Sequence, residues 1–344
     1  MTPEVMREVA ARLADDVLFP AALDVDRADR VPSSHLDRLA AEGLYGVAAP
    51  PEEGGLGVED MVVAADLVQT LASGCLTTAF VWIQHHGCLI ASTFSQQAGV
   101  RKRWLAPLAR GEVRAGIAYA GAPARNGPNR LRLRRIDTSF ILDGEVPWVS
   151  GWNMVDVIHV AAVDENDVVH FLIVDAATSP TLHVTPLDLV AAQASRTVNV
   201  RFQAHEVAAD RLTGVTPYAE WAESEASGSA LNGFLALGVV DRCRRLRGVP
   251  GWLDAEIAHC RSDLLANDRA RTVSGRAAAS ELAVRATATL AVHAGSRSVL
   301  RTEHPQRLLR EAAFLLVFGS RPAIRESLLA GLDHRAPHVT VNAP

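Results

Sequence analysis

Two adjacent histidines, His85 and His86, are the first residues whose type suggests chemistry. They lie in the strongly apolar stretch 76–94, which contains no charged side chain. Imidazole exchanges protons near neutral pH, so either ring can serve as an acid or base, or bind a carbonyl oxygen. The ordinary alternative is a polar residue packed between helices and hydrogen-bonded to a backbone group. The sequence leaves both interpretations open.

Metal and disulfide chemistry are not indicated. The chain has four cysteines, Cys75, Cys88, Cys243 and Cys260. None forms a C-x-x-C pair, and none stands at zinc-site spacing from histidines, so buried free thiols in a reducing compartment are expected. His334 and His338 are four residues apart, but Pro337 prevents the helix that would bring them together. We therefore predict no metal site.

Charge and hydropathy restrict the partners. The net charge of -5 excludes a dominant basic surface, so nucleic acid is not an expected partner. The N-terminus carries acidic residues and lacks the basic start and apolar run of a signal peptide. No uncharged apolar run of about 18 residues occurs, so no membrane span is expected. We predict a cytoplasmic protein with several substructures, because 344 residues exceed one typical domain.

The elements that must position these residues fall into three blocks. Apolar spacing predicts helices in the first block, over 5–18, 35–42, 59–72, 76–94 and 97–108. Short runs rich in valine and isoleucine predict strands over 114–120, 139–142, 155–163, 168–174 and 197–202. Helical periodicity returns over 227–245, 253–266, 269–300, 305–318 and 322–332. The strands have no helix-length connections, which favours an antiparallel barrel or sandwich over parallel βαβ units.

Five local strings in this order resemble the acyl-CoA dehydrogenase family. They are LAAEGLYGVAAPPEEGGLGVEDM (39–61), RKRWLAPLARGEVRAGIAYA (101–120), DGEVPWVSGWNMVD (143–156), SRTVNVRFQAHEVAADRLTG (195–214) and TEHPQRLLREA (302–312). The resemblance implies an α+β fold with an N-terminal helical domain (1–112), a central antiparallel β-barrel or sandwich (113–214), a C-terminal four-helix bundle (215–333) and a tail (334–344). It also implies homodimers or homotetramers.

The same resemblance implies FAD as cofactor and an acyl thioester, on CoA or a carrier protein, as substrate. In the family a carboxylate base removes the α-proton, the flavin accepts the β-hydride, and an electron-transfer partner can reoxidise the flavin. Trp148 and Ser150 match the family's ring-packing tryptophan and its hydroxyl at the flavin N5 edge. An ordinary sheet aromatic is the alternative interpretation of Trp148.

Other cofactor contacts depart from the family pattern. The family's T-E-P-G-x-G-S-D string reads here Gly121 to Pro128, with Pro123 as its one match. We expect Tyr119, Gly121, Pro123 and Gly151 to lie along the cofactor. Arg125 is expected to pair with its pyrophosphate, a solvated loop arginine being the alternative.

The family's catalytic glutamate is replaced by Gly319. Glu225, near the start of the first bundle helix, is a substitute base, or else part of an acidic first helical turn favoured by the helix dipole. His85 and His86 complete the predicted catalytic set. The leading hypothesis is α,β-dehydrogenation with a non-standard base. A reduced-flavin-dependent monooxygenase of the same fold, which needs no α-proton base, and a non-catalytic subunit of a hetero-oligomer are the alternatives.

Overall fold

The computed structural model describes residues 1–57, 61–122, 131–227, 230–247 and 252–334. The chain divides into two compact units, Met1–Ser224 and Glu225–Pro344. The first unit contains both the predicted N-terminal helices and the predicted β-region, and the second contains the predicted C-terminal helices. The predicted order of helices, then strands, then helices is confirmed.

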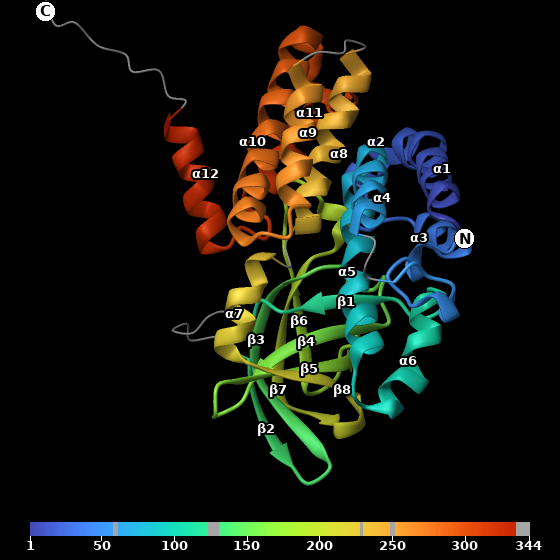
Figure 1. Ribbon diagram of the computed structural model, residues 1–344, viewed down its shortest axis with the longest axis vertical. Coiled ribbons are helices and arrows are strands. Elements are labelled where there is room, and N and C mark those ends of the chain that lie inside the picture. The colour runs from blue at the N-terminus through green and yellow to red at the C-terminus, as the bar shows by residue number, and fades with distance from the viewer. Residues whose placement is uncertain (58–60, 123–130, 228–229, 248–251, 335–344) are drawn as a thin grey trace, which may run out of the picture. The chain divides into compact units, whose positions relative to one another are not determined.

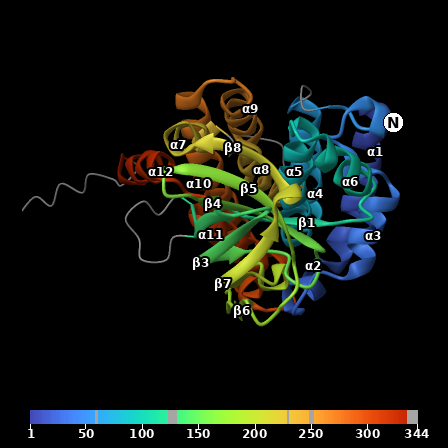
Figure 2. The same ribbon diagram turned by 90° about the horizontal axis from the view of Figure 1, so that it is seen from below.

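In the described part of the first unit, six α-helices precede the strands (Figure 1). They are α1 (Pro3–Leu13), α2 (Phe19–Arg27), α3 (Ser33–Ala41), α4 (Met61–Gly74), α5 (Leu76–Phe94) and α6 (Ala98–Ala109). The single helix expected over 5–18 is instead α1 followed by a π-helical turn, Ala14–Leu18. The apolar α5 lies alongside strand β1 (Ala115–Ala118), as Figures 1 and 2 show. This helix therefore carries His85 and His86 against the sheet beside β1.

The remaining strands are β2 (Arg132–Ile136), β3 (Ser139–Val149), β4 (Val157–Val163), β5 (Val168–Asp175), β6 (Leu182–Pro186), β7 (Val198–Ala208) and β8 (Leu212–Pro217). They form one sheet in the order β6-β7-β3-β2-β4-β5-β8, with β1 also paired to β4. Most neighbours are antiparallel, but β1 and β2 run parallel to β4, which corrects the expectation of a wholly antiparallel sheet. The β2–β3 hairpin separates β1 from β4 in sequence, so β4 can run in the same direction as β1 without a crossover helix.

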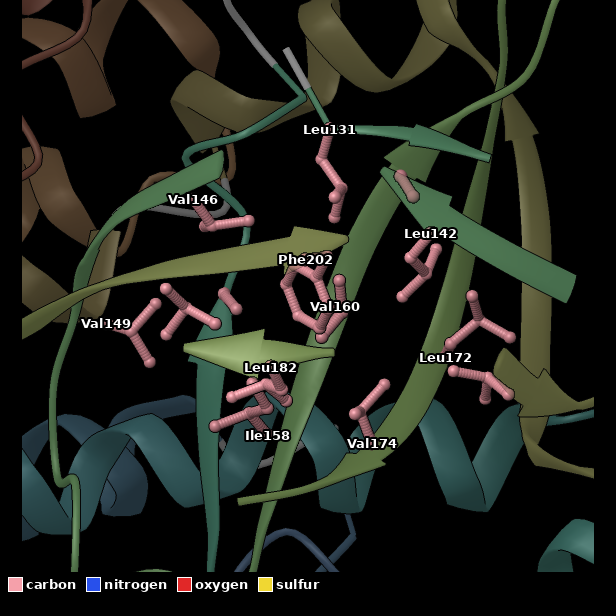
Figure 3. Close-up of a cluster of buried hydrophobic side chains, with 14 of the residues drawn as sticks. Leu131, Leu142, Val146, Val149, Ile158, Val160, Leu172, Val174, Leu182 and Phe202 are labelled. Carbon is pink, nitrogen blue, oxygen red and sulfur yellow. The ribbon is translucent and has the colours of Figure 1, made fainter. Parts of the chain in front are cut away.

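Strand β4 is the buried centre of this sheet. All seven of its residues are buried, and alternate side chains enter different clusters because successive strand residues point to opposite faces. Ile158, Val160 and Ala162 belong to a cluster of buried hydrophobic side chains, many of which Figure 3 draws. Val157 packs instead with residues of α5 and α6. The long strand β3 contributes Val146 and Val149 to the cluster of Figure 3, and so anchors the segment that precedes Ser150.

The second unit is helical. After α7 (Tyr218–Ser227), which spans the boundary, it contains α8 (Ala230–Arg247), α9 (Trp252–Leu264), α10 (Arg269–Ala294), α11 (His304–Val317) and α12 (Pro322–His334). The alanine-rich α10 packs against α8, α9, α11 and α12 (Figure 1), and α8 to α11 form the predicted four-helix bundle. Helix α10 ends at Ala294 rather than at residue 300, because Gly295 turns the backbone to a φ of 66°.

Candidate functional site

Trp148 is held outward at the end of β3. Its side chain is 62% exposed, whereas its neighbours Val146 and Val149 are fully buried. The pairing of β3 with β7 is irregular between these two valines, and Trp148 has a φ of 62°. A left-handed backbone costs a residue with a side chain about 1–2 kcal/mol, and such strain gathers at ligand sites. The fold thus presents a large aromatic surface to solvent at a backbone cost.

Ser150 begins a chain of three buried hydroxyls. Its Oγ lies 2.8 Å from Oγ1 of Thr197, which lies 2.7 Å from Oγ of Ser195. Ser195 ends a 3-10 turn, Gln193–Ser195, and the left-handed backbone of Arg196, with a φ of 47°, separates it from Thr197. Although this spacing was visible in the sequence, nothing there indicated which distant hydroxyl the two would meet.

Two glycines let the chain pass closely at Ser150. Gly151 has a φ of 90°, and its N–H donates to the carbonyl oxygen of Ser195 at 2.8 Å. Gly116 of β1 approaches so closely that a Cβ there would lie 3.0 Å from the carbonyl oxygen of Ser150. The backbone at Ser150 is therefore fixed by β1 on one side and by the segment at Ser195 on the other.

Tyr119 belongs to a second buried chain. Its hydroxyl lies 2.6 Å from Nδ1 of His159, whose Nε2 lies 2.8 Å from Oγ1 of Thr213. Because the Thr213 hydroxyl donates to the carbonyl oxygen of Phe171, it must accept the hydrogen of Nε2. Nδ1 of His159 is then an acceptor, and the Tyr119 hydroxyl donates to it. Burial lowers the pKa of His159 to about 3, which keeps this ring neutral.

The remaining cofactor-binding predictions concern the segment after β1. Gly121 follows the strand, and a Cβ there would lie 2.9 Å from Cγ2 of Val146 and 3.1 Å from the carbonyl oxygen of Glu145. Glycine is thus the residue that this close packing permits. Pro123 and Arg125 lie outside the described residues, so their roles stay predictions.

His85 is bonded to backbone on both sides of its ring. Nδ1 accepts the N–H of Ala115 at 3.1 Å, and Nε2 donates to the carbonyl oxygen of Leu108 at 3.1 Å. Burial, followed by the charge of His86, holds the pKa of His85 well below its usual value. These contacts join α6 to β1 and favour the packing interpretation over a catalytic one, since neither nitrogen is left for a substrate.

His86 is buried in a different way. Neither ring nitrogen has a hydrogen-bond partner among the described residues. The ring packs edge-on against Trp82, with ring centroids 4.6 Å apart. Burial lowers the pKa of His86 to about 4 despite nearby backbone carbonyls, the first of them that of Leu44. A neutral imidazole with unused nitrogens keeps its capacity to bind or relay a proton.

The two predicted positions of a catalytic carboxylate both lie at ends of helices. Glu225 stands in α7, near the end of that helix and not in the first turn of a bundle helix as expected, and its side chain is outside the description. Gly319 directly follows the C-cap of α11 with a φ of 58°, and a Cβ there would lie 3.4 Å from Nδ2 of Asn232. Arg276 donates to the carbonyl oxygen of Phe318 and so caps the same helix end. Here the glycine serves as a helix stop.

The other predictions concern metals and membranes. Among the described residues no cluster of three or more potential metal ligands occurs, and all four cysteines are free and buried. In the same part of the chain, no helix combines the length and apolarity that a bilayer span requires. A surface groove of about 520 Å³ lies between β3 and β7 near Asp143 and Arg201, and it contains none of the predicted site residues.

The sequence is similar to those of known proteins. Residues 2–112 match a family model described as "Acyl-CoA dehydrogenase, N-terminal domain". The mitochondrial short-chain specific acyl-CoA dehydrogenase of Bos taurus is 23% identical over 220 residues, covering 62% of this chain and 53% of that protein. The chain thus spans about half the length of the curated relatives that it matches first.

Solved structures match over nearly the whole chain. Butyryl-CoA dehydrogenase from Megasphaera elsdenii has a TM-score of 0.83 at 15% identity, covering 97% of this chain and 99% of its own. A glutaryl-CoA dehydrogenase from Mycobacterium smegmatis, solved in complex with FADH2, has a TM-score of 0.78 at 14% identity, covering 98% and 95%. At this level of identity the likeness shows a shared fold.

Proposed function

We propose that this chain, whose residues 2–112 match the acyl-CoA dehydrogenase N-terminal domain and whose fold is shared with enzymes of that kind, is an FAD-dependent oxidoreductase acting on an acyl thioester. The observation that carries the proposal is the pair Trp148 and Ser150. The exposed indole of Trp148, on a left-handed backbone, stands two residues from the buried hydroxyl of Ser150. The indole supplies an aromatic plane for a flat ring, and the hydroxyl supplies a polar group for the edge of that ring. The thioester is attached to CoA or to a carrier protein.

The residues present fit an isoalloxazine ring. Trp148 would pack against the ring, and Ser150 would hydrogen-bond its edge. The Gly151 N–H is engaged with Ser195, and the Tyr119 hydroxyl with His159, so we assign these two residues to holding the site rather than to touching the cofactor. Gly121 would allow close approach of the backbone, and Arg125 is proposed for the pyrophosphate. When bound, FAD supplies the redox chemistry, and the protein positions it.

The base remains a proposal with two candidates. Gly319 offers no carboxylate, and both nitrogens of His85 are bonded to backbone, so Glu225 and His86 are left from the predicted set. Glutamate at 225 offers the ordinary chemistry of the family, whereas His86 offers a neutral imidazole with unused nitrogens. Loss of substrate-dependent flavin bleaching in Glu225→Gln, but not in His86→Gln, would assign the role to the glutamate.

The glycine at 319 also favours a second candidate function. A reduced-flavin-dependent monooxygenase of this fold uses O2 in place of the acyl β-hydride and requires no base at that position. Anaerobic bleaching of bound FAD by an acyl thioester supports dehydrogenation. Oxygen-dependent turnover with externally supplied reduced flavin, without such bleaching, would favour the monooxygenase.

We also propose that the chain works as a homodimer or homotetramer with an electron-transfer partner. The second unit exposes large aliphatic side chains at 73–83%, namely those of Val292, Val299 and Val317. Exposed apolar side chains of this kind are the ones that a subunit interface would cover. Sedimentation of the purified protein tests this assembly. A flavin-free hetero-oligomer would instead support a non-catalytic subunit.

The central test is FAD uptake. We expect purified protein to carry FAD, or to take it up with the absorbance of bound flavin. Trp148→Ala is expected to weaken FAD binding about tenfold, because an aromatic stacking contact contributes roughly 1 kcal/mol beyond its buried area. The matched control is Phe94→Ala, which removes another exposed aromatic, 58% accessible, at the end of α5. Colourless protein that takes up no FAD would overturn the proposal.

A further inference from the structure

We propose that Thr197 and Ser195 are positioning residues that make Ser150 a hydrogen-bond donor toward the bound cofactor, so that the site favours oxidised FAD over reduced FAD. This inference rests on the proposed function and goes beyond it, because it assigns a redox bias to residues that do not touch the ring. The inference is based on which hydroxyl donates and which accepts in each hydrogen bond among Ser150, Thr197 and Ser195.

Thr197 is the central hydroxyl and must take part in both hydrogen bonds. Its Oγ1 lies 2.8 Å from Ser150 and 2.7 Å from Ser195, and all three side chains are buried. A hydroxyl donates one hydrogen and can accept two. If Thr197 accepted from both serines, its own hydrogen would be buried with no acceptor among the described residues, which is costly. Thr197 therefore donates to one serine and accepts from the other. Only two arrangements of the chain satisfy this condition.

The end of the chain at Ser195 decides between the two arrangements. Within the part of the chain that the structure describes, Thr197 is the one hydrogen-bond partner of the Ser195 hydroxyl. If hydrogens pointed from Ser150 toward Ser195, the Ser195 hydrogen would be buried without an acceptor, which is costly. If they point from Ser195 toward Ser150, the hydrogen without an acceptor among the described residues is that of Ser150, and the cofactor of the proposed function would accept it. The hydrogen of Ser150 is then directed out of the chain.

The backbone keeps this geometry in place. The Gly151 N–H bonds the Ser195 carbonyl oxygen at 2.8 Å, and the Trp152 N–H bonds that of Arg196 at 3.3 Å. Ser150 is therefore a preorganised donor beside the Trp148 segment. The N5 edge of oxidised flavin accepts a hydrogen bond, whereas the reduced edge carries its own hydrogen and donates. A donor fixed in this direction binds oxidised flavin more tightly than reduced flavin. The tighter binding of the oxidised form lowers the midpoint potential of the bound cofactor.

The experiment compares the midpoint potential of bound FAD with that of free FAD, which gives the ratio of the affinities for the two forms. We expect Ser150→Ala to reduce the preference for oxidised FAD about tenfold, which raises the potential by about 30 mV for a two-electron couple. Thr197→Val, which keeps the shape but neither donates nor accepts, is expected to reduce the preference by at least threefold. Thr197→Ser restores the hydroxyl and is expected to return the ratio to within twofold of wild type.

The controls separate this effect from general damage. Thr93→Val removes a half-buried hydroxyl whose one hydrogen-bond partner among the described residues is Leu89 of its own helix, and it is expected to leave the potential unchanged. Ser195→Ala is expected to shift the ratio less than Thr197→Val, because Thr197 can still donate to Ser150. If Thr197→Val binds FAD with the wild-type potential while Ser150→Ala shifts it, the positioning role is overturned and the proposed function stands. If wild type takes up no FAD, both are overturned.

Discussion

The hydroxyl of Tyr119 donates a hydrogen bond of 2.6 Å to Nδ1 of His159, and so ties the end of β1 to the buried centre of β4. Gly87 of α5 makes this possible, since a Cβ there would lie 3.3 Å from the Tyr119 hydroxyl. The bond fixes the strand that leads to Gly121. Tyr119 thereby positions the proposed cofactor-binding segment at Gly121 without itself contacting the cofactor.

Tyr119→Phe tests that bond. The substitution leaves the buried Nδ1 of His159 without a donor, and an unsatisfied buried polar atom costs about 1–3 kcal/mol. We expect a loss of that size in the free energy of unfolding from denaturant titration. Tyr45→Phe is the matched control, because no hydrogen bond of the Tyr45 hydroxyl is found among the described residues, and its loss should be smaller. Equal stability of Tyr119→Phe and wild type would contradict the assignment.

Acid should destabilise the first unit through its buried histidines. The pKa of His159 is lowered to about 3 and that of His86 to about 4, against about 6.5 when unfolded. The unfolded chain therefore binds more protons between these values, and stability is complete above pH 6.5 and falls as the pH drops through this window. At pH 5 each such histidine accounts for a loss of roughly 2 kcal/mol.

The variant His159→Gln should flatten this dependence. It removes one titrating group, so its unfolding free energy should change less between pH 7 and pH 5 than that of wild type. His183→Gln, at an exposed position of β6, controls for the substitution itself. An undiminished slope in His159→Gln would show that this ring is not neutral in the folded state.

His85 and His86 should differ sharply on replacement by leucine. His85→Leu leaves the buried N–H of Ala115 and the carbonyl oxygen of Leu108 unbonded, at about 1–3 kcal/mol each. His86→Leu removes two nitrogens that have no partner in the described part of the chain, so we expect a change within about 1 kcal/mol. Thermal melts of both variants provide the comparison. A loss of stability in His86→Leu as large as that in His85→Leu would refute the assignment of hydrogen bonds to His85 alone.

Gly319 should resist the return of a side chain. At a φ of 58°, alanine is expected to cost about 1–2 kcal/mol in the free energy of unfolding, and asparagine less, because asparagine tolerates the left-handed region. Gly99 of α6 is the control, since its φ is unremarkable and a Cβ there meets nothing within 4 Å, so Gly99→Ala should be neutral or stabilising. A neutral Gly319→Ala would remove the conformational reason for this glycine.

The second unit contains a buried ion pair that should be expensive to break. Arg307 donates to Glu311 at 2.5 Å, with side chains 1% and 2% exposed. Glu311→Gln removes one charge and leaves the other buried, which typically costs about 3–5 kcal/mol. The exposed pair Arg12–Glu42 is the comparison, where Glu42→Gln should cost less than about 1 kcal/mol. Similar losses of unfolding free energy in Glu311→Gln and Glu42→Gln would show that burial does not make the Arg307–Glu311 pair costlier to break.

The sequence by itself determined the order of the elements and the place of the candidate site. Apolar periodicity and punctuation by glycine and proline are local properties, so they predicted α5, α6, β4 and β5 closely. Strands β2, β6 and β8 escaped prediction because β2 is largely charged and the other two are short and half-exposed. The spacing of Trp148 and Ser150 identified their segment, because neighbours in sequence stay neighbours in space.

Only the tertiary structure decided what each of these side chains contacts. Ser150 meets Thr197 across 47 residues, and Tyr119 meets His159 across 40, through pairings that depend on strand order and register. The same is true of His85, whose two backbone partners come from α6 and β1. A hydrogen bond requires atoms within about 3 Å, and that precision arises from packing between distant segments, which no local pattern records.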